Sequence, residues 1–223
     1  MANTNSVKFD ISDCTLREQT EEHLGWSTGS NVYLVLRVPK QRADWPFDLR
    51  DVDAARSFFS QQCASNGGAL LEMESVKVGS YPALRGLFKY RSPIPQSLGL
   101  MFVNILWIPL GSCTAQLNVE SLEHGETGGR EAAVSLIESE GEVSPPESEP
   151  VLVRSVEEMF SHMRAQPLRA LPSDAQKYDQ SFPEHPLSKV RHRMEQVLQT
   201  ISIADEELAS SQGKSASKWW KFW

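Results

Sequence analysis

Residues 70–120 read LLEMESVKVGSYPALRGLFKYRSPIPQSLGLMFVNILWIPLGSCTAQLNVE, and this stretch decides the fold. Its apolar and β-branched residues recur in separate runs, and the gaps between the runs contain the glycine, proline and serine typical of turns. In the last run, Ala115, Leu117 and Val119 alternate with polar residues, which predicts one buried and one solvated face. We therefore expect an antiparallel meander with strands at Leu70–Val78, Ala83–Tyr90, Leu100–Ile108 and Thr114–Glu120.

A strand and a helix are predicted before this meander, and a second helix after it. Val32–Val38 is β-branched and aromatic, which indicates a strand. Asp51 can cap a helix that ends at Asn66-Gly67-Gly68. Arg130–Glu138 is predicted to be a helix with Ala133, Val134 and Ile137 facing inward. We also expect a short strand over Val7–Ile11 and a loop-like or weakly helical segment over Thr15–His23.

This order of elements predicts an α+β fold, with an antiparallel sheet flanked by helices rather than repeated βαβ units. Residues 139–150 are acidic and proline-rich, which is typical of a solvated linker. We therefore expect a sandwich core at residues 1–138, a helical extension at 151–209 and a flexible Lys/Trp tail at 210–223. In the extension, an apolar stripe after Pro186 predicts a helix docked on the main body, with Lys189, Arg191, Arg193 and Glu195 on its opposite side; the stripe is Leu187, Val190, Met194, Val197, Leu198 and Ile201.

Composition excludes several classes of protein. The chain has 223 residues and a formal net charge of −7, which argues against general nucleic-acid binding. The most apolar run, Leu98–Leu110, is shorter than the roughly 20 residues that span a bilayer. The polar residues 1–10 lack the apolar segment of a secretory signal, and the three cysteines are too few for a disulfide framework. These features predict a cytoplasmic protein.

Residue patterns that carry catalysis or bind metals are weak in this sequence. Cys113 and His124 would lie at opposite ends of one strand, and His185 and His192 are only two of the three or four ligands that a metal needs. Glu72 and Glu74 share one face of a strand. Their spacing is explained more simply by alternation on a solvated sheet surface than by a pair of carboxylates for acid–base chemistry. We therefore expect no catalytic residues, no cofactor and no metal.

Aromatic residues in two places are candidates for contact with a partner. Trp45 and Phe47 lie in one loop, where they either fold onto the core or anchor a partner. The tail ends with Trp219, Trp220, Phe222 and Trp223 interleaved with lysines. These rings can dock back onto the chain, fill a pocket of a partner, or make weak contact with an anionic membrane.

The segment Val78-Gly79-Ser80-Tyr81-Pro82-Ala83, with Gly67-Gly68 before it and Phe88-Lys89-Tyr90 after it, resembles the turn between two strands in the Mog1/PsbP-like family. The resemblance covers roughly residues 25–138. Residues 127–131 and 182–188 look like landmarks of an uncharacterised bacterial group with the same core. Because most members of the wider superfamily are not enzymes, the resemblance implies the family's sandwich fold and a binding role.

We therefore expect a non-catalytic protein-binding factor, such as an adaptor, a secretion chaperone or an immunity-like protein. Its contact surface would be the exposed face of the sheet or the loop of Trp45 and Phe47, with the aromatic tail as a second contact. The alternatives are a small hydrolase with an unrecognised site and a peripheral membrane protein anchored by the tail.

Overall fold

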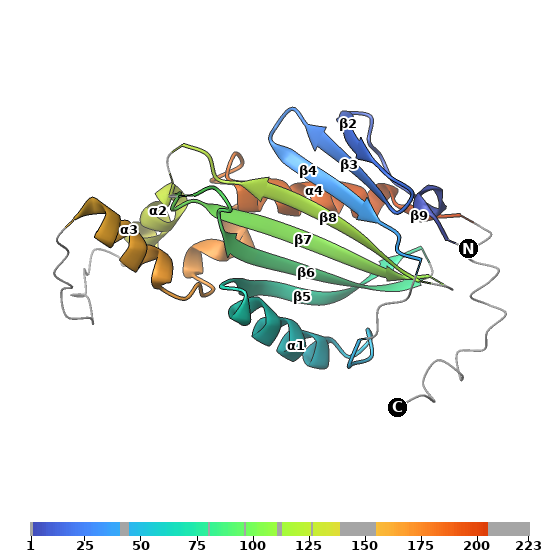
Figure 1. Ribbon diagram of the computed structural model, residues 1–223, viewed down its shortest axis with the longest axis horizontal. Helices are drawn as coiled ribbons and strands as arrows, with labels where there is room; N and C mark the ends of the chain where they lie inside the picture. The colour runs from blue at the N-terminus through green and yellow to red at the C-terminus, as the bar shows by residue number, and fades with distance from the viewer. Residues whose placement is uncertain are drawn as a thin grey trace.

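The computed structural model describes residues 2–40, 45–79, 81–95, 97–110, 113–125, 127–138 and 155–204. These residues form an antiparallel sheet of seven strands in the order β2-β3-β4-β8-β7-β6-β5 (Figure 1). The fold is therefore α+β, with the antiparallel sheet and flanking helices that the sequence predicts.

The predicted meander is confirmed. Its strands are β5 (Ala69–Val78), β6 (Tyr81–Arg91), β7 (Leu100–Pro109) and β8 (Thr114–Leu122), and each pairs with the next in antiparallel register. Gly79 ends β5 with a φ of +59°, a conformation that residues with a side chain rarely adopt. The predicted strand at Val32–Val38 is also present, as β4 (Val32–Arg37), and it pairs with β8.

The prediction of a loop or weak helix at Thr15–His23 is wrong. The chain instead forms a hairpin of β2 (Cys14–Gln19) and β3 (His23–Thr28). β2 is an edge strand whose residues are mostly exposed, so it lacks the apolar alternation that would have identified it. At the N-terminus, η1 (Thr4–Ser6) precedes β1 (Val7–Lys8), which is shorter than predicted and pairs with β9 (Ser202–Ile203).

Helix α1 (Val52–Ser65) and helix α4 (Pro186–Thr200) pack on opposite faces of the sheet. Successive residues of β6 show this, because Leu84 and Phe88 join the cluster beneath α1, whereas Leu87 joins the cluster beneath α4. Asp51 caps α1 as predicted, accepting the N–H of Ala54 at 2.9 Å. We call the two sides of the sheet the α1 face and the α4 face; in Figure 1, α4 lies behind the sheet.

The predicted docking of the last helix is confirmed. The apolar side of α4 belongs to the same core as Leu34 and Leu117 of the sheet, and burying each such side chain contributes about 1.5–3 kcal/mol. The expectation that Arg191 and Arg193 face solvent is wrong, since they are only 2% and 7% exposed. The helical residues that complete this core are Leu187, Val190, Met194, Val197 and Ile201.

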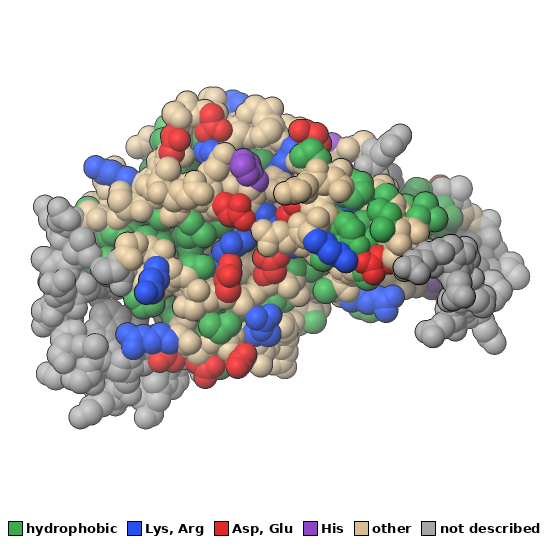
Figure 2. All heavy atoms as spheres, turned by 180° about the vertical axis from the view of Figure 1, so that it is seen from behind, with side chains coloured by type: hydrophobic (Ala, Val, Ile, Leu, Met, Phe, Trp, Pro, Cys, Tyr) green, Lys and Arg blue, Asp and Glu red, His purple; other side chains and the backbone are tan. Residues whose placement is uncertain are grey.

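Two further helices, α2 (Gly129–Glu138) and α3 (Val156–Ala165), lie at one end of the molecule (Figure 1). Val134 is buried as predicted, but Ile137 is 60% exposed rather than inward-facing. Two short turns, η2 (Pro172–Asp174) and η3 (Gln176–Tyr178), connect α3 to α4. Seen from behind, acidic and basic side chains intermix over the centre of the molecule, and hydrophobic side chains gather toward the end with α2 and α3 (Figure 2).

Parts of several predictions lie outside the described residues. These are the linker at 139–150, the first four and the last five residues of the extension, and the tail at 210–223 with Trp219, Trp220, Phe222 and Trp223. Within the described part of the chain, no helix combines the length and the apolar character needed to cross a bilayer.

Candidate functional site

A pocket of about 350 Å³ lies between α1 and the α1 face of the sheet. One wall comes from α1, a second from β6, β7 and β8, and a third from the loop before α1. Most of its lining is aromatic or aliphatic. We call it the aromatic pocket; its apolar walls are Trp45, Phe58, Phe59, Phe88, Ile105 and Trp107.

Ring contacts give this pocket its shape. Phe59 of α1 stacks on Trp107 of β7, with ring centroids 4.7 Å apart. Trp45 meets both of these rings edge-on, at 5.3 Å and 5.4 Å, and Phe47 packs against Trp45 and Phe59. Aromatic pairs in these orientations stabilise each other beyond the area they bury. Trp45 and Phe47, the predicted partner contacts, are thus half-buried against the core, and Trp45 forms part of the pocket wall.

The indole N–H groups at the pocket have different partners. Trp107 Nε1 donates to Gln116 Oε1 at 3.2 Å. Trp45 Nε1 is buried and has no acceptor among the described residues. A buried donor without an acceptor is unfavourable. This N–H is also shielded from solvent, so a carbonyl oxygen of another molecule would reach it only if the rings around it move.

A row of polar side chains runs from the pocket along β8. Gln116 Nε2 donates to Asn118 Oδ1 at 2.8 Å, and Asn118 Nδ2 donates to Glu120 Oε1 at 2.9 Å. Opposite them on β4 lie Val35 and Tyr33, and Tyr33 is 47% exposed. We call Tyr33, Val35, Gln116, Asn118 and Glu120 the open sheet face. It adjoins the pocket through Gln116, which belongs to both.

The titratable groups of the pocket are not activated. Burial raises the pKa of the Cys63 thiol, so the thiolate that would act as a nucleophile is disfavoured. Burial, and then the hydrogen bond with Cys63, raise the pKa of the Tyr90 hydroxyl. Both groups therefore remain protonated near neutral pH, and the pocket offers shape and hydrogen bonds rather than a nucleophile or a base.

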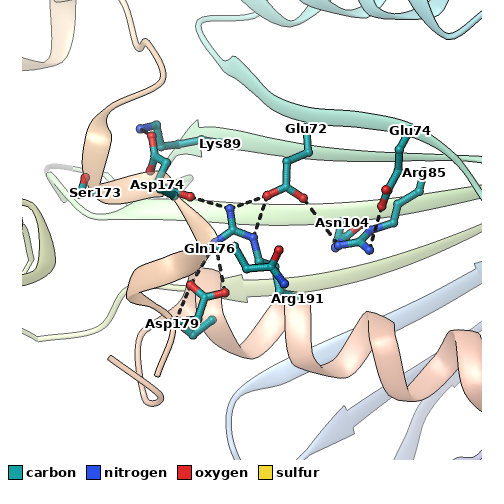
Figure 3. Close-up of polar contacts among 12 residues, drawn as sticks. Glu72, Glu74, Arg85, Lys89, Asn104, Ser173, Asp174, Gln176, Asp179 and Arg191 are labelled. Atoms are coloured by element: carbon teal, nitrogen blue, oxygen red, sulfur yellow. Dashed lines mark hydrogen bonds and ion pairs between the residues drawn. The ribbon is translucent and has the colours of Figure 1, made fainter. Parts of the chain in front are cut away.

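The α4 face carries a network of ion pairs whose cations are buried (Figure 3). Lys89, 1% exposed, donates to Asp174 at 2.6 Å. Arg191 bridges Glu72 at 2.5 Å and Asp179 at 3.0 Å, and Arg85 contacts Glu74 at 3.0 Å. Opposite charges meet throughout this network, so it ties η2, η3 and α4 to the sheet. Glu72 and Glu74, considered above as an acid–base pair, are partners of arginines here.

The other candidates from the sequence are not brought together. Cys113 is buried at one end of β8, and His124 is exposed beyond its other end. His185 caps α4 instead of sharing a helical face with His192. The sequence analysis predicted the exposed face of the sheet as a contact surface, and the alternation in β8 placed Gln116 and Asn118 on its solvated side. It did not single out Gln116, Asn118 or Glu120 as site residues.

Comparison with known proteins returns no matching family model and no matching curated protein. Among solved structures, a point mutant of the protein Mog1 aligns at a TM-score of 0.45 and 10% sequence identity. The alignment covers 93% of this chain and 99% of the Mog1 chain. At this score and identity the likeness carries no argument about activity or partners.

Proposed function

We propose that this chain is a non-catalytic binding protein, whose protein partner inserts an apolar side chain into the aromatic pocket and lies along the open sheet face. The observation that carries the proposal is the buried Trp45 Nε1, which has no acceptor among the described residues and borders a pocket lined with rings. An adaptor, a secretion chaperone and an immunity-like protein would each use such a surface. We propose that the protein acts in the cytoplasm, as the sequence predicts.

The surroundings of the pocket favour a protein over a small molecule. Its volume, about 350 Å³, is at the low end of the range for small-molecule sites, and the half-exposed amides of Gln116 and Asn118 continue from it onto a strand. Side-chain amides both donate and accept hydrogen bonds, which suits the peptide groups of a partner. A buried aromatic anchor with a polar surround is the usual anatomy of a protein–protein contact.

Photo-crosslinking tests this function directly. A photoreactive amino acid would replace Gln116 in one version of the full chain and Leu16, which is 49% exposed on the edge strand β2, in a matched control. We expect crosslinks to a defined protein from position 116, and their loss when Phe58→Arg places a charge in the pocket. Crosslinks of equal yield from position 16, or crosslinks insensitive to Phe58→Arg in a folded protein, would refute the proposal.

A further inference from the structure

Three potential metal ligands from separate parts of the chain lie close together near the C-terminal end of β8. They are Glu123, which directly follows β8, Glu131 in the first turn of α2, and His185 at the N-cap of α4. One ligand atom from each lies within 4.8 Å of the other two. The site shares no residue with the aromatic pocket.

The surrounding contacts hold two of these ligands in place. Glu123 Oε2 accepts the N–H of Leu100 at 2.8 Å, and Glu123 N–H donates to the Leu100 carbonyl at 2.9 Å. These reciprocal bonds leave Glu123 Oε1 facing His185 Nε2, at 3.1 Å. The His185 ring also packs edge-on against Phe102, with centroids 5.4 Å apart. A metal site needs this kind of outer support, because the supporting contacts orient the ligands.

Glu131 is the independent indication of a ligand. Both of its carboxylate oxygens are shielded from solvent, and neither has a hydrogen-bond partner among the described residues. Its neighbour Arg130 cannot neutralise it, because the guanidinium group turns away to Ser173, Ser188 and Asp179. A charged carboxylate that is shielded from solvent and has no hydrogen-bond partner is unfavourable unless a cation lies beside it.

We propose that Glu123, Glu131 and His185 bind a divalent first-row transition-metal ion such as Zn²⁺. One imidazole nitrogen and two carboxylate oxygens suit Zn²⁺ better than Mg²⁺ or Ca²⁺, which prefer oxygen ligands alone. Two ligands that each lie about 2.1 Å from one metal at a tetrahedral angle are about 3.4 Å apart. Glu123 Oε1 and His185 Nε2 are 3.1 Å apart, so they need to separate by only a few tenths of an ångström to hold the ion. The ion would join β8, α2 and the start of α4.

Binding requires one rearrangement of His185. Its Nδ1 now accepts the N–H of Leu187 at 3.2 Å, so a neutral ring carries its proton on Nε2 and donates it to Glu123. A metal on Nε2 moves that proton to Nδ1, and the Leu187 N–H has to find another acceptor. The bond that is lost is at the long end of the hydrogen-bond range, so this rearrangement lowers the affinity without preventing binding.

Calorimetric titration of the full chain with Zn²⁺, after treatment with a chelator, tests the site. We expect one Zn²⁺ per chain, a rise in melting temperature, and no comparable response to Mg²⁺. Glu131→Gln keeps the shape of the side chain and removes its charge, so it should weaken Zn²⁺ binding by about 100-fold, the upper end of the 10–100-fold lost with an outer partner. His185→Asn should weaken it similarly.

Glu184→Gln is the matched control, because Glu184 lies next to His185, its side chain is 88% exposed and it pairs only with Lys189 among the described residues. It should bind Zn²⁺ as the unmodified chain does. Circular dichroism of each metal-free variant shows whether it folds, and Co²⁺ absorption shows whether nitrogen and oxygen ligands bind the ion. Equal Zn²⁺ affinity in folded Glu131→Gln, or no binding by the unmodified chain, would overturn the proposal.

Discussion

The two faces of the sheet differ in how their buried polar groups are paired and in whether a pocket stays open beside them. On the α4 face, the cations Lys89, Arg85 and Arg191 each meet a carboxylate, and α4 covers the apolar residues beside them. On the α1 face, Trp45 Nε1 has no acceptor among the described residues, and a pocket stays open beside α1. The buried cations of the first face all have carboxylate partners among the described residues, although Asn104 Nδ2 on that face has no hydrogen-bond partner among them. For the second face, we propose that another molecule fills the pocket.

This difference separates a structural role from a binding role. A network of paired charges with buried cations holds segments distant in the sequence together, as Arg191 does with Glu72, 119 residues away. A pocket with an unpaired donor costs stability in the free protein, and binding can recover that cost. We therefore propose that the α1 face binds the partner and that the α4 face holds the fold together.

The largest effect should come from breaking the buried Lys89–Asp174 ion pair on the α4 face. Lys89→Ala leaves Asp174, only 6% exposed, as an unpaired buried carboxylate, and should lower the free energy of unfolding by about 3–5 kcal/mol. Urea denaturation measures the loss. Lys177→Ala removes a cation that pairs with Glu138 but is 65% exposed, and it should leave stability unchanged. Similar losses for both variants would contradict a special role for the buried pair.

A smaller loss of stability should follow when a methyl group is added at Gly68, where the chain packs tightly against Tyr90 and Cys63. A Cβ at Gly68 would lie 2.5 Å from the Tyr90 ring and 2.7 Å from Cys63 Sγ. Gly68→Ala should therefore destabilise the protein by about 1–3 kcal/mol through overpacking. A Cβ at Gly29 meets no atom within 4 Å, so Gly29→Ala is the control in the same urea experiment. An unchanged midpoint for Gly68→Ala would show that the floor of the pocket is loosely packed.

The two indole groups allow a finer comparison. Trp107→Phe removes a ring that donates to Gln116, whereas Trp45→Phe removes one whose N–H has no acceptor among the described residues. We expect Trp107→Phe to cost about 1 kcal/mol more than Trp45→Phe in unfolding experiments, since only the former breaks a hydrogen bond. If Trp45→Phe costs as much, the Trp45 N–H is satisfied in the free protein and the reason for assigning binding to the α1 face is lost.

The smallest effect should appear at alkaline pH. Burial raises the pKa of Tyr90 above the ordinary tyrosine value of 10.0, so the unfolded chain loses this proton at a lower pH than the folded chain. Stability from this group is therefore complete below pH 10 and falls as pH rises toward the folded-state pKa. Tyr90→Phe should reduce the slope of stability against pH above 10. An identical slope in the variant would show that Tyr90 does not contribute to it.

Local patterns were enough to predict most of the fold. The β5–β8 meander, the Asp51 cap and the apolar stripe of α4 each depend on neighbouring residues, and each is confirmed. The β2–β3 hairpin was missed because an edge strand exposed on both faces shows no alternation. The charged residues Arg191 and Arg193 resemble a solvated helix face, and only partners far along the chain explain their burial.

The candidate sites were predictable only in part. Trp45 stood out as an aromatic residue in a loop, but its contacts with Phe59 and Trp107 depend on how α1 packs on the sheet. Glu131 and His185, 54 residues apart in the sequence, carry no signal of proximity. Spacing identifies a site when its residues share one element, and both sites here are assembled from several.

The central claim is that the α1 face accepts an apolar side chain beside Trp45. Nuclear magnetic resonance of the indole N–H groups, titrated with N-acetyltryptophanamide, tests it most directly. Trp26 is an internal control, because it is 7% exposed and packs with the α4-face core. We predict that the Trp45 signal moves saturably while the Trp26 signal stays fixed. If neither signal moves, or both move together, the aromatic pocket does not receive such a side chain.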